Sequence, residues 1–198
     1  MVKWNRLRER NRMADLKEIQ KQLKEVLEEK RYNHTLGVMY TAASLAMRYN
    51  EDMEAAMLAG LLHDCGKFAP VADQIALCKE YHLHLTEAEL HIPALIHAKL
   101  GVFLAEEKYG IHDKRILDAI LYHTTGKPNM NMLEKIIYLA DYIEPGRKMI
   151  PGLTDVRTLT FTNIDEAVCL CSQMTLSYLE RAGRAVDPMT RQTYEYYK

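Results

Sequence analysis

A histidine and an aspartate stand side by side at His63 and Asp64, directly after the apolar run 57–62. The run has helical spacing, so both groups come where a helix ends and can project into one cavity. Gly66 permits a tight turn just beyond them, and Lys67 adds a cation suited to phosphate. This segment therefore predicts metal-dependent chemistry on a phosphate compound.

Four further residues have the types and the contexts of metal ligands. His34 precedes the pair, and His97, His123 and Asp141 follow it, each within an apolar helical pattern. A lone histidine on such a helix is more often a packed core or surface group than a ligand. Four imidazoles and two carboxylates together favour a metal site. The set is too rich in nitrogen for magnesium and too large for one structural zinc, whereas two iron or manganese ions fit.

The ordered set resembles the HD-domain phosphohydrolase superfamily, in which a histidine, a His-Asp pair and a distant aspartate follow one another. The additional histidines are similar to those of the subgroup that binds a second metal. Three segments together resemble the YqeK family of bacterial symmetrical diadenosine tetraphosphatases, over about residues 13–190: Leu62-His63-Asp64-Cys65-Gly66-Lys67, His123-Thr124-Thr125-Gly126 and Ala140-Asp141-Tyr142-Ile143-Glu144-Pro145-Gly146-Arg147.

This resemblance implies a single-domain HD-domain helical bundle and a reaction. The reaction is symmetrical hydrolysis of diadenosine tetraphosphate, or a related dinucleoside polyphosphate, to two ADP. The cofactors implied are two divalent transition-metal ions, iron first, with manganese or cobalt as alternatives. Two other readings stay open. One is an HD-type hydrolase of another nucleotide, such as a deoxynucleotide or guanosine tetraphosphate, and the other is a nucleotide-sensing module without turnover.

The resemblance also implies how the ligands divide. Asp64 bridges the two ions, and the remaining ligands divide into His34, His63 and Asp141 for one ion and His97 and His123 for the other. Two ions about 3.5–4 Å apart can share a water, lower its pKa and hold a phosphate oxygen. Asp64 is therefore a candidate catalytic residue as well as a ligand.

Two basic residues are candidate catalytic and substrate-binding groups. Lys67 follows the metal motif, and Arg147 follows a Pro-Gly helix stop, so both can neutralise charge on a departing phosphate. Weaker candidates for substrate contact are Thr124, Thr125 and Arg157.

The other polar residues have simpler interpretations. We expect Glu144 to orient Arg147 or a ligand histidine rather than to bind metal. We expect the remaining histidines to be ordinary surface groups: His82, His84, His91 and His112.

Composition limits the class of protein and its partners. The 198 residues, 48% of them apolar, suit one domain, which we place at 13–198 behind an N-terminal extension 1–12. The net charge of −1 gives no general attraction to nucleic acid. No apolar leader or membrane span is visible, and four irregularly spaced cysteines fit reduced thiols in the cytoplasm. We expect a dinucleoside polyphosphate or nucleoside diphosphate ligand, no membrane or nucleic-acid partner, and a homodimer.

Apolar spacing of three and four residues predicts an almost entirely helical chain. The expected helices cover roughly 13–29, 32–49, 51–64 and 71–81, a short one after Thr86, one from Pro93 and one from Asp113, one from Asn131 to Glu144, and the last two at 164–182 and from Pro188. The stretch from Arg147 to Asn163 is expected to be irregular.

Overall fold

Helices account for all of the regular structure in the computed structural model, which describes residues 15–198. This range holds eleven α-helices, two 3-10 helices and no strand, so the all-α prediction is confirmed. The predicted extension 1–12 and the expected helix start at residue 13 lie outside the described residues. The elements are α2 (Leu16–Val26), α3 (Glu29–Tyr49), α4 (Met53–Leu62), η1 (Cys65–Phe68), α5 (Val71–Glu80), α6 (Glu87–His91), η2 (Pro93–Leu95), α7 (Ile96–Glu107), α8 (Lys114–Tyr122), α9 (Met132–Ile143), α10 (Leu153–Thr162), α11 (Ile164–Arg181) and α12 (Pro188–Tyr197).

Several helices begin at the capping residues that the sequence indicates. Thr86 and Asn131 each accept the backbone N–H of a glutamate three residues later, and that glutamate accepts the backbone N–H of the cap in return. Asp113 accepts the backbone N–H of the second residue of α8. These local signals fix where α6, α8 and α9 start, and thereby where the ends that carry His123 and Asp141 lie.

The prediction of an irregular segment from Arg147 to Asn163 is wrong in its second half, because α10 forms there. Leu153, Val156 and Thr160 are buried at helical spacing, and α10 packs on α9 and α11. Four of its ten residues are threonines, whose β-branched side chains lower helix propensity and weaken the helical signal. Arg157 therefore lies on a helix and not in a loop.

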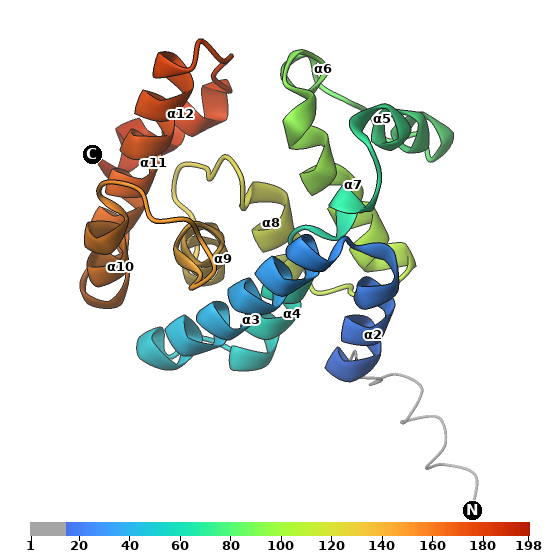
Figure 1. The fold of residues 1–198 in the computed structure, drawn as a ribbon, viewed down its shortest axis with the longest axis horizontal. Coiled ribbons are helices and arrows are strands. Elements are labelled where there is room, and N and C mark those ends of the chain that lie inside the picture. Colours follow the sequence, from blue (N-terminus) through green and yellow to red (C-terminus); the bar gives the residue numbers. More distant parts are fainter. Residues whose placement is uncertain (1–14) are drawn as a thin grey trace, which may run out of the picture.

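The centre of the bundle is formed by α3, α4, α8 and α9 (Figure 1). Side chains such as Met39, Leu61, Ile120 and Ile136 are fully buried between them and form the main core. On one side α7 packs against α8 and η1, and on the other α10 and α11 pack against α9, with α12 on α11. This packing brings the ends of five helices to one region.

Two further observations bear on the expected class of protein. No helix among residues 15–198 has both the length and the apolar character that crossing a membrane requires.

All four cysteines are free thiols. Burial raises the pKa of Cys65 to about 12, so this thiol next to Asp64 stays protonated and packs as a small apolar group.

Candidate metal centre

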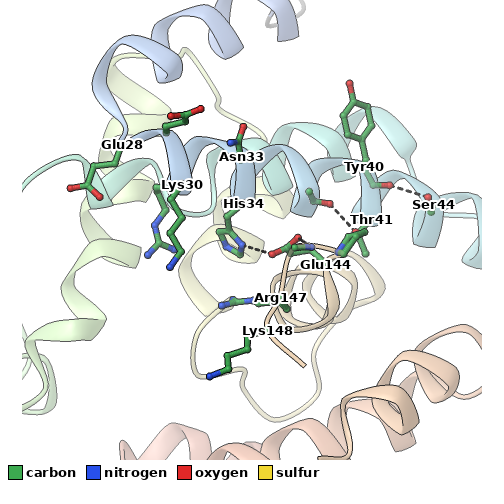
Figure 2. A pocket seen from close by; sticks show the side chains of 15 residues that line it. Glu28, Lys30, Asn33, His34, Tyr40, Thr41, Ser44, Glu144, Arg147 and Lys148 are labelled. Atoms are coloured by element: carbon green, nitrogen blue, oxygen red, sulfur yellow. Dashed lines mark hydrogen bonds and ion pairs between the residues drawn. The ribbon is translucent and has the colours of Figure 1, made fainter. Parts of the chain in front are cut away.

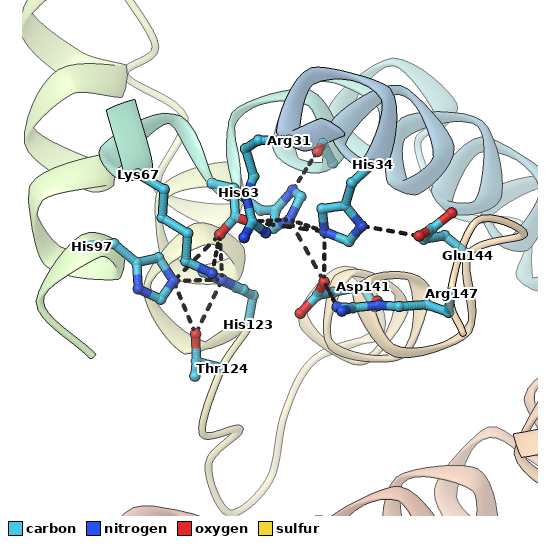
Figure 3. Close-up of polar contacts among 12 residues, drawn as sticks. Arg31, His34, His63, Lys67, His97, His123, Thr124, Asp141, Glu144 and Arg147 are labelled. Carbon is cyan, nitrogen blue, oxygen red and sulfur yellow. Dashed lines mark hydrogen bonds and ion pairs between the residues drawn. The ribbon is translucent and has the colours of Figure 1, made fainter. Parts of the chain in front are cut away.

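The six predicted ligands lie on, or directly after, five helices and meet in one cluster, in which Figure 3 labels the four histidines and Asp141. His34 lies in the second turn of α3, His63 and Asp64 follow the end of α4, His97 is the second residue of α7, His123 follows α8, and Asp141 is in the last turn of α9. His34 is one turn further into its helix than expected, because α3 starts at Glu29. Four of the six side chains are almost completely buried: His63, Asp64, His97 and His123.

The hydrogen bonds of the buried histidines fix which ring nitrogen faces the cluster. The Nδ1 atoms of His63, His97 and His123 lie 2.7, 2.6 and 2.6 Å from the backbone carbonyl oxygen three residues earlier. A carbonyl oxygen can only accept, so each Nδ1 carries the proton and donates it. Each Nε2 atom of a neutral ring is then a bare lone pair directed inward.

These lone pairs face one another at short range. The Nε2 atoms of His97 and His123 are 3.1 Å apart, and those of His63 and His34 are 3.3 Å apart. Two lone pairs at such distances have no proton to share and repel, unless a cation lies against both. The donor set therefore fits a metal centre better than a packed polar core.

Asp64 lies between the two histidine pairs and turns one carboxylate oxygen to each. Its Oδ2 atom is 3.4 Å from His63 Nε2 and 3.8 Å from His34 Nε2, while its Oδ1 atom is 3.4 Å from His97 Nε2 and 3.5 Å from His123 Nε2. Oδ1 is buried and accepts no hydrogen bond of regular geometry, although Lys67 Nζ lies 2.9 Å away. The charge of Lys67 offsets part of the cost of burying this oxygen and leaves its lone pairs without a regular hydrogen bond.

The protonation states suit metal binding. Burial lowers the pKa of His63, and it lowers that of His97 well below its usual range, because a charged imidazole is disfavoured away from water. Burial alone would raise the pKa of Asp64 and Asp141. Neighbouring groups outweigh burial and hold both carboxyl pKa values well below normal. For Asp64 these are the His63 imidazole and the Lys67 cation, and for Asp141 they are the His34 imidazole and the Arg147 cation. Neutral imidazoles and ionised carboxylates are the forms that bind metals.

Three cations surround the carboxylates. Lys67 pairs with Asp64, and Arg147 donates to both the backbone oxygen and a carboxylate oxygen of Asp141. The predicted contact of these two cations with phosphate stays a prediction. The third is Arg31, whose Nη1 atom lies 2.7 Å from Asp64 Oδ2 and whose side chain is 37% exposed. All three are partly open to solvent, so they can also reach an anion bound at the cluster.

Sequence reasoning missed Arg31, since a basic residue in the first turn of a helix usually faces solvent. One signal was available: it precedes His34 by three residues, which places both on the same side of α3. Glu144 was expected to orient Arg147 or a histidine, and it contacts His34, with Nδ1 and Oε1 3.0 Å apart. The four histidines without a motif are exposed, as expected.

The three weaker candidates for substrate contact lie in different positions. The Thr124 hydroxyl is at the centre, 3.1 Å from His123 Nε2 and 3.3 Å from His97 Nε2. Thr125 donates its hydroxyl to a neighbouring backbone oxygen. Arg157 donates to the backbone oxygens of Ile143 and Glu144, each at 3.0 Å, and so holds the end of α9. A direct contact of Arg157 with substrate stays a prediction.

A cavity of about 1180 Å³ opens beside His34, between α3 and the segment 144–148. Four basic side chains lie on its wall, Lys30, Arg31, Arg147 and Lys148, against three carboxylates, Glu28, Glu29 and Glu144, and we call it the cationic cavity. Figure 2 shows His34, Arg147 and Lys148 on the same side of α3, next to Glu144. Its position and charge suit a polyanion that reaches the metal cluster from this end.

Comparisons with known proteins agree with this geometry. Residues 31–146 match the family model of the HD domain. The chain is similar to the symmetrical bis(5'-nucleosyl)-tetraphosphatases of Bacillus subtilis (strain 168), at 42% identity over 88% of this chain and 92% of the relative, and of Staphylococcus aureus (strain NCTC 8325 / PS 47), at 37% identity over 88% and 90%. A solved structure from Clostridium acetobutylicum, described as a predicted HD superfamily hydrolase involved in NAD metabolism, is 40% identical with a TM-score of 0.87 and covers 91% of this chain and 95% of its own.

Proposed function

The chain belongs to the HD domain family, and from that premise we propose that it hydrolyses dinucleoside tetraphosphates symmetrically, converting diadenosine tetraphosphate into two ADP with the help of two divalent metal ions. The observation that carries the proposal is the ring of inward-facing imidazole nitrogens around the two oxygens of Asp64. The substrate is supported by the activity named for the relatives in Bacillus and Staphylococcus, to which the chain is similar over 88% of its length.

We assign each histidine to one of two ions according to the carboxylate oxygen of Asp64 that it faces. His34, His63 and Asp141 would hold one ion, His97 and His123 would hold the other, and Asp64 would contribute to both. Support comes from His34, His63 and Asp141, whose ligand atoms all lie within 4.8 Å of one another, and from a second such group, His63, Asp64 and His123, in which Asp64 joins the two sets. A shell of nitrogen and carboxylate oxygen atoms suits iron, with manganese and cobalt as alternatives.

The reaction adds a water oxygen to one of the two central phosphorus atoms and breaks its bond to the central bridging oxygen, so that one ADP departs. When bound, the two ions supply a reactive water at neutral pH and an anchor for a phosphate oxygen. The residues of the chain bind and orient the substrate. Arg31, Lys67 and Arg147 place their positive charges beside the phosphates and stabilise the charge that develops on the departing ADP.

The proposal also includes the domain bounds, the location and the oligomeric state expected from the sequence. The catalytic domain covers residues 13–198, the protein works in the cytoplasm, and it forms a homodimer. Free thiols at all four cysteines support a reducing compartment.

The decisive experiment combines metal analysis with product identification. The protein is purified without oxygen, its metals are measured, and a series of dinucleoside polyphosphates is incubated with it and resolved by chromatography. We expect about two metal ions per chain and ADP as the sole nucleotide product of diadenosine tetraphosphate. ATP plus AMP would reject symmetrical cleavage, and nucleotide binding without any product would favour a sensing module.

A further inference from the structure

A second cavity meets the metal cluster at the end opposite to the cationic cavity. It has a volume of about 200 Å³ and reaches Thr124, whose hydroxyl lies 3.1 Å from His123 Nε2. Figure 3 shows Thr124 beside His97 and His123, with Arg147 and Glu144 at the far end of the cluster. A substrate that crosses the cluster can therefore extend into both cavities.

The second cavity differs from the first in its chemistry, and we call it the apolar cavity. Among residues 15–198, no lysine or arginine lines it. Its walls come from α6, η2, α7, α8 and the start of α12, and they include four apolar side chains, Leu95, Ala98, Leu121 and Met189, and two carboxylates, Glu89 and Asp187. Glu89 pairs with Lys99 through Oε2, at 2.6 Å, and Asp187 caps α12 by accepting the backbone N–H of Met189 through Oδ1. The second oxygen of each carboxylate can accept an N–H group of an uncharged ring.

We infer that the apolar cavity binds a nucleobase of the substrate, and this inference rests on the proposed function. A flat, uncharged, largely apolar ring with N–H donors matches the apolar walls and the two free carboxylate oxygens. Phosphates match the cationic cavity instead, where four basic side chains outnumber three glutamates. The difference in charge between the two cavities sets the orientation of the substrate across the metal cluster.

In this orientation each part of the dinucleotide has a defined position in the site. The base of the half that receives the water lies in the apolar cavity, and its ribose and first phosphate pass Thr124. The bond that breaks lies over the metal cluster. The departing half extends past His34 into the cationic cavity. Both halves of diadenosine tetraphosphate are chemically identical, so either half can enter the apolar cavity first.

The wall that recognises the base lies partly outside the segment that matches the HD domain. That match ends at residue 146, whereas Met189 belongs to α12. Thr193 of α12 donates to the backbone oxygen of Thr125, and the Tyr197 hydroxyl accepts the backbone N–H of Met130. These bonds hold the C-terminal helix against the segment after His123. In this assignment the HD segment supplies the metal ligands, and α12 contributes to the specificity for the nucleobase.

The test compares ADP, which has a base, with pyrophosphate, which has none, on the manganese-loaded protein by calorimetry. Met189→Ala removes an apolar wall, and Leu121→Trp fills the cavity. The matched control is Met47→Ala, because Met47 is 67% exposed on α3 and lines neither cavity. We expect Met189→Ala to weaken ADP binding about tenfold, the scale of burying one such side chain, and to leave pyrophosphate binding unchanged. Leu121→Trp should act in the same direction, and Met47→Ala should change neither ligand.

Unchanged ADP affinity in Met189→Ala would overturn the assignment of the base, and so would an equal loss for ADP and pyrophosphate. Failure of the proposed function appears in the product analysis of the wild-type protein instead. ATP plus AMP, or nucleotide binding without any product, would reject symmetrical hydrolysis whatever the ADP affinity of Met189→Ala, so the two failures are distinguishable.

Discussion

The position of one proton on each buried histidine decides what the cluster can bind. His63, His97 and His123 each donate their Nδ1 proton to the backbone carbonyl oxygen three residues earlier, so no Nε2 proton remains to bridge the facing rings. Glu144 occupies the corresponding position beside His34. The backbone thus sets the direction of the ligands before any ion arrives, which reduces the cost of ordering them on binding.

Asp64→Asn tests the bridging carboxylate. The substitution keeps the size of a buried side chain and removes the charge that would be shared by two ions. We expect loss of most activity and of one or both metals, with helix content unchanged by circular dichroism. Near-normal turnover and two bound metals in the variant would show that Asp64 is not a bridge.

Arg31→Ala, Lys67→Ala and Arg147→Ala test the three cations. Each removes a charge-assisted hydrogen bond worth about 1.5–3 kcal/mol, so kcat/KM should fall roughly tenfold or more while the metal content persists. Arg115→Ala is a matched control, because Arg115 pairs with Asp113 on the surface away from the cluster. If all three variants had the same kinetics as this control, the three cations would be ordinary solvent-exposed charges without a role in catalysis.

The contact between η1 and α7 sets the spacing between Asp64 and His97. Gly66 lies so close to α7 that an added Cβ atom would be 2.2 Å from the backbone oxygen of His97. Backbone cannot move aside as a flexible side chain can. Gly66 therefore holds the turn that follows the His-Asp pair against the helix that supplies the next ligand.

Gly66→Ala should push these two elements apart. We expect the free energy of unfolding in urea to fall by about 1–3 kcal/mol, with reduced metal content. Gly101→Ala is the control in the same contact: its added Cβ would have its nearest neighbour at 3.5 Å, an ordinary contact. Within a helix this change should be neutral or stabilising by about 0.5–1 kcal/mol. Equal stability of the two variants would contradict the close-approach explanation.

Arg157→Ala separates a structural role from substrate binding. Losing the two bonds to the end of α9 should lower the free energy of unfolding by about 1.5–3 kcal/mol, discounted for the partial exposure of the side chain. Arg181→Ala serves as a control, since Arg181 bonds only within its own helix and is exposed. A raised KM for diadenosine tetraphosphate with unchanged stability would instead support direct contact.

Over the whole molecule, charge is nearly balanced but not evenly distributed. There are 26 lysines and arginines against 27 aspartates and glutamates, yet four basic residues face three glutamates on the cationic cavity, and none of the basic residues within 15–198 lines the apolar cavity. Such local separation can guide one polyanion to one end of the cluster without attracting nucleic acid in general.

Hydrolysis in heavy-oxygen water tests the reaction as a whole. Diadenosine tetraphosphate should give ADP only, with one ADP of each pair carrying the label on its terminal phosphate, because a single water oxygen is added per bond broken. Mass spectrometry of the products reads both the bond and the label. Label in AMP or ATP would mean that another bond is cleaved.

The sequence by itself determined the ligand types, their order and most helix starts. Caps such as Asp113 and Asn131 act over two or three residues, so the chain records them locally. The sequence did not predict the helix at Leu153–Thr162, because its threonines weaken the local helical signal and its stability comes from packing on α9 and α11.

Only the tertiary structure decided which distant groups meet. His34 and Glu144 are 110 residues apart and come together because α3 packs on α9. Packing of α3 on α4 pairs Arg31 with Asp64, and the assembled helices leave a cavity with basic side chains at one end of the metal cluster and a mainly apolar cavity at the other. Local rules describe neighbours along one helix, whereas these contacts depend on how several helices fit together, which no short stretch of sequence specifies.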